Sequence, residues 1–68
     1  MVVRVDTLKP GNLFQESYLF GDSSHVVYYY KVLACGEDDG SSCVFAQELG
    51  SKNIYIFPAF AMVEVWVI

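Results

Sequence analysis

The sequence is poor in positive charge. It contains four Lys and Arg residues against eight Asp and Glu residues, which gives a net charge of −4. Nucleic-acid binding depends on many cations that displace counterions from phosphates, and anionic membrane surfaces also attract basic segments. We therefore expect neither a nucleic acid nor a membrane as a partner. A basic protein surface is the better electrostatic match for this chain.

A long hydrophobic segment is also missing. The chain begins Met1-Val2-Val3-Arg4, without the basic start and apolar stretch of an export signal. The apolar tail Ile54–Ile68 is shorter than the roughly 20 residues of a membrane-spanning helix. Pro58 and Glu64 interrupt that tail. We expect a soluble, cytoplasmic protein.

Apolar side chains, by contrast, are abundant. They make up 54% of the 68 residues, and aromatic residues make up 16%, which excludes a disordered chain and fits one small domain. Turn residues separate short runs rich in Val, Ile, Tyr and Phe, and no window has helical spacing. Five or six short strands predict an all-β fold, a closed or nearly closed barrel. The predicted strands are Val2–Val5, Leu13–Phe20, Val26–Cys35, Cys43–Leu49, Ile54–Phe57 and Met62–Ile68.

Two turns and one strand can be predicted in more detail. Pro10-Gly11 fits the centre of a type II turn, and Asp39-Gly40 is a hairpin signal between two strands. In the strand Val26–Cys35 the face that carries Lys31 is at least partly wet, so we expect the other face to line the core. That core face consists of Tyr28, Tyr30, Val32 and Ala34.

The last predicted strand is apolar on both faces. Such strands are normally covered on both sides, either by a sheet that closes on itself or by another subunit. Trp and Met are enriched at the centres of protein contacts, so one face is the candidate interface, for a second copy or another protein. The alternative is that these residues pack inside the barrel. The candidate interface consists of Met62, Glu64, Trp66 and Ile68.

Three consecutive carboxylates, Glu37, Asp38 and Asp39, are expected at a hairpin tip. The register of a calcium loop, with alternating oxygen donors that end in a bidentate Glu, is missing around them. A solvated polar turn is the simpler interpretation. The alternative is an acidic knob that meets Arg or Lys side chains of a partner.

Two cysteines, Cys35 and Cys43, flank the same turn. A regular hairpin could place them opposite each other, close enough for a disulfide. We favour two reduced thiols, as in a cytosolic core. With His25 they would still lack a fourth zinc ligand. The adjacency of Ser23, Ser24 and His25 is no evidence for a catalytic triad, because a triad is assembled in space around an acid that orients the histidine. We expect no metal, no cofactor and no enzymatic activity.

Tyrosines are the remaining candidates for a site. A base-stacking platform comes with a positively charged groove, and Lys31 is nearly the only cation near these rings in the sequence. We favour packing in the core or in an interface. The candidate platform consists of Tyr18, Phe20, Tyr28, Tyr29, Tyr30 and Tyr55.

The opening Val5-Asp6-Thr7-Leu8-Lys9-Pro10-Gly11-Asn12-Leu13-Phe14 resembles the start of small Src-homology-3-like β-barrels. The run from Tyr28 to Ala34, a Gly-rich turn and Cys43-Val44-Phe45 are similar to the central hairpin of such barrels. The resemblance implies a Src-homology-3-like barrel, and short acidic proteins of this kind are frequent among bacteriophage accessory proteins. The peptide-binding pattern of the eukaryotic members is absent, so polyproline binding is not expected.

The sequence therefore predicts a small, acidic, non-enzymatic protein-binding module. The resemblance adds that it is phage-encoded and docks on a host protein in the host-cell cytoplasm, where it modulates that protein. One alternative is a small-ligand or nucleotide-binding module whose aromatics line a pocket between subunits. Another is a structural subunit of a larger assembly.

Overall fold

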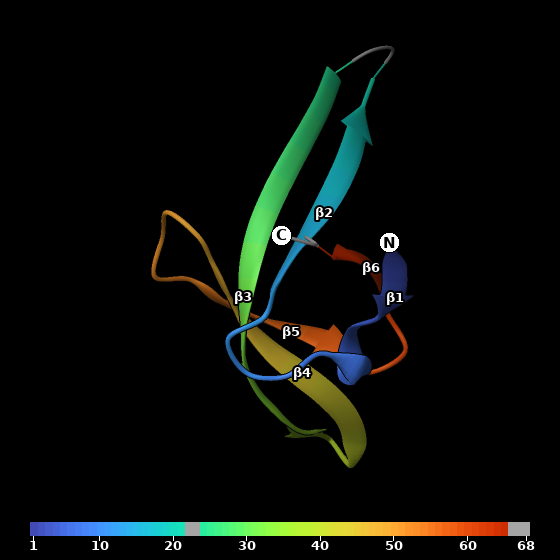
Figure 1. Cartoon of the computed structure of the whole chain (residues 1–68), viewed down its shortest axis with the longest axis vertical. Coiled ribbons are helices and arrows are strands. Elements are labelled where there is room, and N and C mark those ends of the chain that lie inside the picture. The colour runs from blue at the N-terminus through green and yellow to red at the C-terminus, as the bar shows by residue number, and fades with distance from the viewer. Residues whose placement is uncertain (22–23, 66–68) are drawn as a thin grey trace.

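A computed structural model describes residues 1–21 and 24–65 of the chain, although the side chains of residues 19, 20 and 24 are not described (Figure 1). These residues form one antiparallel sheet of six strands in the order β1-β6-β2-β3-β4-β5, so the predicted all-β class is confirmed. The described residues contain no helix long and apolar enough to cross a membrane. The elements are β1 (Val2–Arg4), the 3-10 turn η1 (Val5–Thr7), β2 (Leu13–Phe20), β3 (Ser24–Asp38), β4 (Ser41–Glu48), β5 (Ile54–Pro58) and β6 (Met62–Val65).

The predicted type II turn precedes β2. The Asn12 N–H donates a hydrogen bond of 3.0 Å to the Lys9 carbonyl, and Gly11 has a φ of +94°. Glycine reaches this left-handed region without a steric penalty. The Gly11 N–H donates to the Val32 carbonyl, and the Val32 N–H donates to the Asn12 carbonyl. The turn is thereby tied to β3, which sets the register of the strand that follows.

The predicted Asp39-Gly40 turn joins β3 to β4. Both residues have positive φ, 52° and 77°, which is the type I′ conformation that matches the twist of paired strands. The ladder therefore continues to the pair Asp38 and Ser41. As a result β3 ends at Asp38 instead of the predicted Cys35, and β4 begins at Ser41 instead of the predicted Cys43.

A β-bulge changes the face of β3. The ladder with β4 shifts its register between Val32 and Ala34, so Leu33 is the extra residue. Before the bulge, Tyr30 and Val32 are buried and Lys31 is exposed, as the alternation predicts. After the bulge the alternation is reversed. The predicted core position of Ala34 is therefore wrong, and this residue is exposed.

The two-residue turn offsets the two cysteines by one pair in the ladder. Cys35 lies opposite Val44, and Cys43 lies opposite Gly36, one pair further along the ladder. Neighbouring residues of a strand point to opposite faces of the sheet. The two thiols are therefore not opposite each other, as a regular hairpin could have placed them, and both are free, as the favoured interpretation of the sequence holds.

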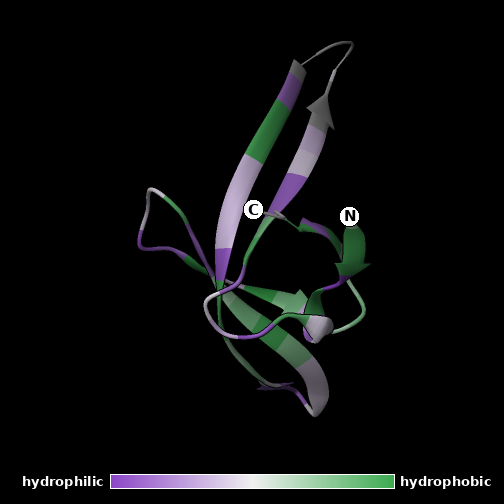
Figure 2. Cartoon of the chain, in the orientation of Figure 1, coloured by the Kyte–Doolittle hydropathy of each residue, from purple (hydrophilic) through white to green (hydrophobic). Residues whose placement is uncertain are grey.

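The core lies on the inner face of a strongly coiled sheet (Figures 1 and 2). The sheet does not close into a barrel, because β1 remains at one edge and β5 at the other. At Val5 the chain leaves β1 for η1, and the Val5 N–H donates to the Ala61 carbonyl at 2.7 Å, in line with the register of β1 and β6. The expectation of a closed barrel is therefore wrong. The buried cluster consists of Val5, Phe14, Tyr30, Val32, Val44, Ala46 and Val63.

The hairpin of β2 and β3 extends beyond the rest of the sheet (Figure 1). In the described residues β6 pairs with β2 at Phe14 and Gln15, and β4 pairs with β3 from Tyr30 onward. Residues 16–20 and 24–28 therefore form a two-stranded ladder without a neighbouring strand on either side in the described structure. We refer to these residues as the arm.

Candidate functional site

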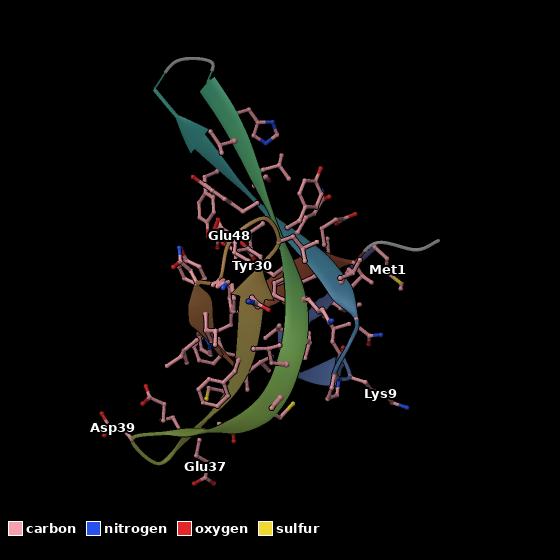
Figure 3. All side chains as sticks on the ribbon, turned by 90° about the vertical axis from the view of Figure 1, so that its left-hand side faces the viewer. Met1, Lys9, Tyr30, Glu37, Asp39 and Glu48 are labelled. Carbon is pink, nitrogen blue, oxygen red and sulfur yellow. The ribbon has the colours of Figure 1, made fainter. Side chains whose placement is uncertain are left out.

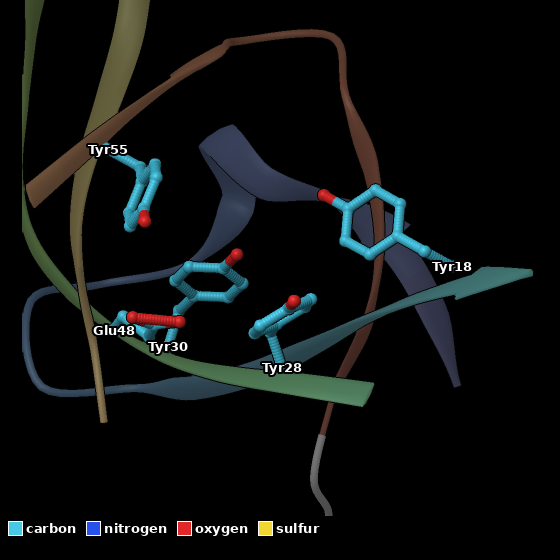
Figure 4. Close-up of a pocket in the computed structure, with 5 residues that line it drawn as sticks. All are labelled: Tyr18, Tyr28, Tyr30, Glu48 and Tyr55. Carbon is cyan, nitrogen blue, oxygen red and sulfur yellow. The ribbon is translucent and has the colours of Figure 1, made fainter. Parts of the chain in front are cut away.

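A pocket of about 300 Å³ lies on the inner face of the sheet where the arm begins (Figure 4). Four of its lining residues are tyrosines, which come from β2, β3 and β5, and the fifth is a glutamate at the end of β4. Alternation along β3 turns Tyr28 and Tyr30 to this face, and Tyr18 lies diagonally across the ladder from Tyr28. The lining residues are Tyr18, Tyr28, Tyr30, Glu48 and Tyr55.

The tyrosine rings pack edge to face. The ring centroids of Tyr18 and Tyr28 are 5.7 Å apart at 66°, and those of Tyr30 and Tyr55 are 5.7 Å apart at 81°. The ring of Tyr30 also stacks on Phe14 with centroids 5.3 Å apart. Aromatic pairs favour these offset and edge-on arrangements because the ring faces are negative and the edges positive. The pocket walls are thus fixed to the core.

Burial differs between the floor and the walls of the pocket. Tyr30 is 4% exposed and forms the floor, whereas Tyr18 and Tyr55 are each 41% exposed and form the walls. Tyr28 is half-buried between them. The pocket therefore offers aromatic surface that a second molecule can reach without moving the core.

The hydroxyl of Tyr30 stays protonated over a wide pH range. Burial raises the pKa of Tyr30 to about 12, and the neighbouring Tyr18, Glu48 and Tyr55 act in the same direction. A hydrogen bond with the Tyr18 side chain contributes as well. A phenol with this pKa is neutral near pH 7, so it serves as a hydrogen-bonding group and not as a base.

Glu48 is held by the turn that follows it. The Ser51 hydroxyl donates a 2.8 Å hydrogen bond to Glu48 Oε2, and the Asn53 N–H donates to Ser51 Oγ at 3.1 Å. The Glu48 N–H in turn donates to the Asn53 carbonyl at 3.1 Å. The bond from Ser51 occupies Oε2 and leaves Oε1 outside the hydrogen bonds of this turn. The turn thus fixes a carboxylate at the pocket through one of its two oxygens.

The surroundings of the pocket are acidic. Glu16 is the cross-strand partner of Tyr28, and burial raises the pKa of its carboxyl group. Lys31 follows Tyr30 in β3 and therefore points to the opposite face of the sheet. No Lys or Arg is among the described residues that line the pocket. A positively charged groove for nucleic acid is therefore absent from the described lining.

The candidate interface on the last strand is described in part. Met62 is 56% exposed. Glu64 Oε1 accepts a hydrogen bond of 2.8 Å from the N-terminal ammonium group of Met1. Trp66 and Ile68 lie outside the described residues. The role of these four residues as an interface stays a prediction.

The acidic residues Glu37, Asp38 and Asp39 are exposed at the end of the β3–β4 hairpin, as the sequence predicts. Figure 3 shows this turn at the end of the molecule opposite to the arm, well away from Tyr30 and Glu48. The acidic turn is thus separate from the pocket. Its role as a contact for basic side chains stays a prediction.

The candidate stacking platform comes together in part. Four of its tyrosines line the pocket, whereas Tyr29 points to the opposite face and the side chain of Phe20 is not described. The sequence interpretation missed Glu48. The signal was present, because Glu48 follows Val44 and Ala46 at the spacing of two that places residues on one face of a strand. A charged residue on an otherwise apolar strand face is unusual, so its position is worth testing as part of a binding site.

In the part of the chain that the structure describes, no group of three or more His, Cys, Asp and Glu side chains could hold a metal ion. No protein-family model matches the chain, and neither does any curated protein or solved structure. The class of this protein is therefore described from its fold and its pocket. The chain is a small all-β protein whose open, coiled sheet carries a tyrosine pocket with one carboxylate.

Proposed function

We propose that the protein is a non-enzymatic protein-binding module that docks on a basic partner protein through the tyrosine pocket. The observation that carries the proposal is the position of Glu48 beside four tyrosine rings with no Lys or Arg in the described lining. Tyrosine is enriched in residues that dominate protein contacts, and the net charge of −4 favours a basic partner.

The arm supports a protein as the partner. A stable protein contact buries about 800 Å² on each partner, which is more than one small pocket offers. The arm projects from the edge of the pocket and adds the exposed parts of Tyr18 and its neighbours to the accessible surface. That the partner belongs to the host of a bacteriophage is suggested by the Src-homology-3-like turn at Pro10-Gly11, and this element of the proposal rests on that resemblance.

A small-ligand or nucleotide-binding role is the second candidate, since tyrosine rings also stack on bases. The carboxylate of Glu48 opposes it, because the phosphates of a nucleotide would meet a negative charge with no cation in the described lining. A nucleotide that raised the melting temperature of the protein would support this candidate, since binding to the folded state alone must stabilise it. A third candidate, a structural subunit, would be supported by a large particle mass at low concentration.

The test is affinity capture with three forms of the protein: wild type, Tyr55→Leu and Tyr29→Leu. Tyr55 and Tyr29 are comparably exposed, at 41% and 39%, but Tyr29 points away from the pocket, so its variant is the matched control. We expect one protein from the native host to be retained in a fixed ratio by wild type and Tyr29→Leu, and to be lost with Tyr55→Leu. A partner held equally by all three forms, or no partner in a fixed ratio, would contradict the proposal.

A further inference from the structure

We propose that the tyrosine pocket receives the guanidinium group of an arginine side chain from the partner protein. This inference rests on the proposed function and names the group that the pocket recognises. Four tyrosine rings surround the space, and the carboxylate of Glu48 lies at its edge, held by the turn through Oε2 alone. The geometry thus combines aromatic surface with a single fixed negative charge.

A cation is the occupant that this combination favours. The face of an aromatic ring is negative and attracts a cation that lies within about 6 Å of the ring centroid. The partly buried pocket screens this attraction less than open water does. A cation at the pocket would also donate a hydrogen bond to Glu48 Oε1, the oxygen that the turn does not use. An anion would instead be repelled by this carboxylate, and a neutral apolar group would leave its charge uncompensated.

Arginine fits this site better than lysine. A guanidinium group is planar, stacks on aromatic rings and presents five N–H donors, whereas an ammonium group is compact and more strongly hydrated. The carboxylate of Glu48 can accept two parallel N–H bonds, since Oε2 keeps capacity beside its bond from Ser51. The hydroxyl group of the wall tyrosine Tyr55 offers a further acceptor.

The cation has to come from another molecule. The Arg4 guanidinium binds the carboxylate of Asp6, with an N···O distance of 2.8 Å. Lys31 lies on the outer face of the sheet, and Lys9 and Lys52 are exposed outside the pocket lining. All four Lys and Arg residues of the chain are thereby accounted for. None of these four cationic side chains lines the pocket, so a guanidinium group that binds there belongs to another molecule.

The test is a titration of the protein with capped peptides that differ at one position, followed by nuclear magnetic resonance of the backbone amides. The position carries Arg, Lys or citrulline, which has the shape of Arg without its charge. We expect the Arg peptide to shift the signals of Tyr28, Tyr30 and Glu48 to saturation. The citrulline peptide should bind roughly tenfold more weakly, the loss expected when a charge-assisted hydrogen bond is replaced.

Two outcomes of the titration would overturn the inference. If the Lys peptide bound as tightly as the Arg peptide, the planar guanidinium group would not be what the pocket recognises. If the Arg peptide gave no saturable shift at these residues, the pocket would not be a site for this cation at all.

Variants separate the pocket from a general effect of charge. Glu48→Gln removes the charge but keeps an oxygen that can accept the hydrogen bond from Ser51. Asp39→Asn removes the same charge at the distant hairpin turn, and Asn tolerates the positive φ of this position. We expect Glu48→Gln to weaken Arg-peptide binding roughly tenfold, and Asp39→Asn to change it by less than about twofold, since salt screens distant surface charges. Equal losses in both variants would overturn the inference.

The two proposals fail in different ways. If the Arg peptide does not bind, but a captured partner is still lost with Tyr55→Leu, the protein-binding role holds and the arginine assignment falls. If capture of a partner does not depend on Tyr55 and the Arg peptide does not bind, both proposals fall. Amide spectra of each variant, recorded before the titration, show whether it retains the fold.

Discussion

Tyr30 and Glu48 lie directly opposite each other in the ladder between β3 and β4. Tyr30 belongs at the same time to the buried cluster, where its ring stacks on Phe14, and to the floor of the pocket. The pocket is therefore an extension of the core into the base of the arm. Changes at Tyr30 are expected to affect stability as well as binding, so the walls at Tyr18 and Tyr55 are the better positions for testing function.

The first prediction concerns the titration of Tyr30. Its pKa is raised to about 12 from an ordinary value of 10.0, so the unfolded chain releases this proton at lower pH than the folded protein does. The free energy of unfolding should be unaffected by this group below pH 10 and should fall as the pH rises from 10 towards 12. The ultraviolet absorbance of tyrosinate should show an ionisation step near pH 12. Tyr30→Phe should remove this late step, and its persistence in that variant would contradict the assignment.

The second prediction concerns the reactivity of the two thiols. Cys43 is buried, and burial, followed by the nearby Asp38, Cys35 and Glu37, raises the pKa of its thiol, whereas Cys35 is exposed. The thiolate is the reactive form, so a thiol reagent should modify Cys35 quickly and Cys43 slowly. Mass spectrometry over time should show one fast and one slow addition. Cys35→Ser should remove the fast addition, and equal rates for the two thiols would contradict the described burial.

The strands and turns could be predicted from the sequence because their signals are local. Residues two apart in a strand share a face, as Tyr30 and Val32 do. The positive φ of Gly11 and Gly40 allows the turns that separate the strands. The bulge at Leu33 could not be predicted, because an apolar residue fits either face of a sheet. This one residue was enough to displace Ala34 from the core, whereas the offset of the two cysteines follows from the two-residue Asp39-Gly40 turn.

Closure of the sheet and composition of the pocket depend on contacts distant in the sequence. The opening from Val5 to Phe14 resembles a barrel locally, but closure requires the edge strands β1 and β5 to pair, and the described sheet leaves both at its edges. The tyrosines are recognisable as candidates because five of them occur in a short chain. Glu48 shares a face of β4 with Val44 and Ala46, but its place beside the tyrosines follows from the pairing of β4 with β3.

The third prediction concerns a close approach between Gly36 and Phe45. A Cβ atom at position 36 would lie 2.7 Å from Phe45 Cε2, which is closer than such atoms normally approach. Gly36→Ala should therefore destabilise the protein by about 1 kcal/mol, a typical cost of overpacking. In a Phe45→Leu background, which removes this ring atom, the cost should disappear. Chemical denaturation of the four proteins of this double-mutant cycle measures the coupling.

A control for that cycle is Gly40→Ala. Position 40 has open space around it but a φ of +77°, so alanine there is strained by its backbone and not by Phe45. Its cost, about 1 kcal/mol, should be the same in the wild-type and Phe45→Leu backgrounds. A cost of Gly36→Ala that also persisted in the Phe45→Leu background would mean that the ring of Phe45 is not the cause.

The last prediction concerns the stability of the arm. Residues 16–20 and 24–28 pair only with each other in the described structure, whereas Val32 and Val44 have backbone neighbours on both sides. Backbone amides with few flanking strands open locally at low cost, so their hydrogen exchange is fast. Amide exchange should therefore be faster at Ser17 and Val26 than at Val32 and Val44.

Binding of a partner to the pocket and arm should slow exchange at Ser17 and Val26 and leave exchange at Val32 and Val44 almost unchanged. Equal protection of all four amides in the isolated protein would mean that another surface already covers the arm, and a dependence of this protection on protein concentration would identify that surface as a second copy of the chain.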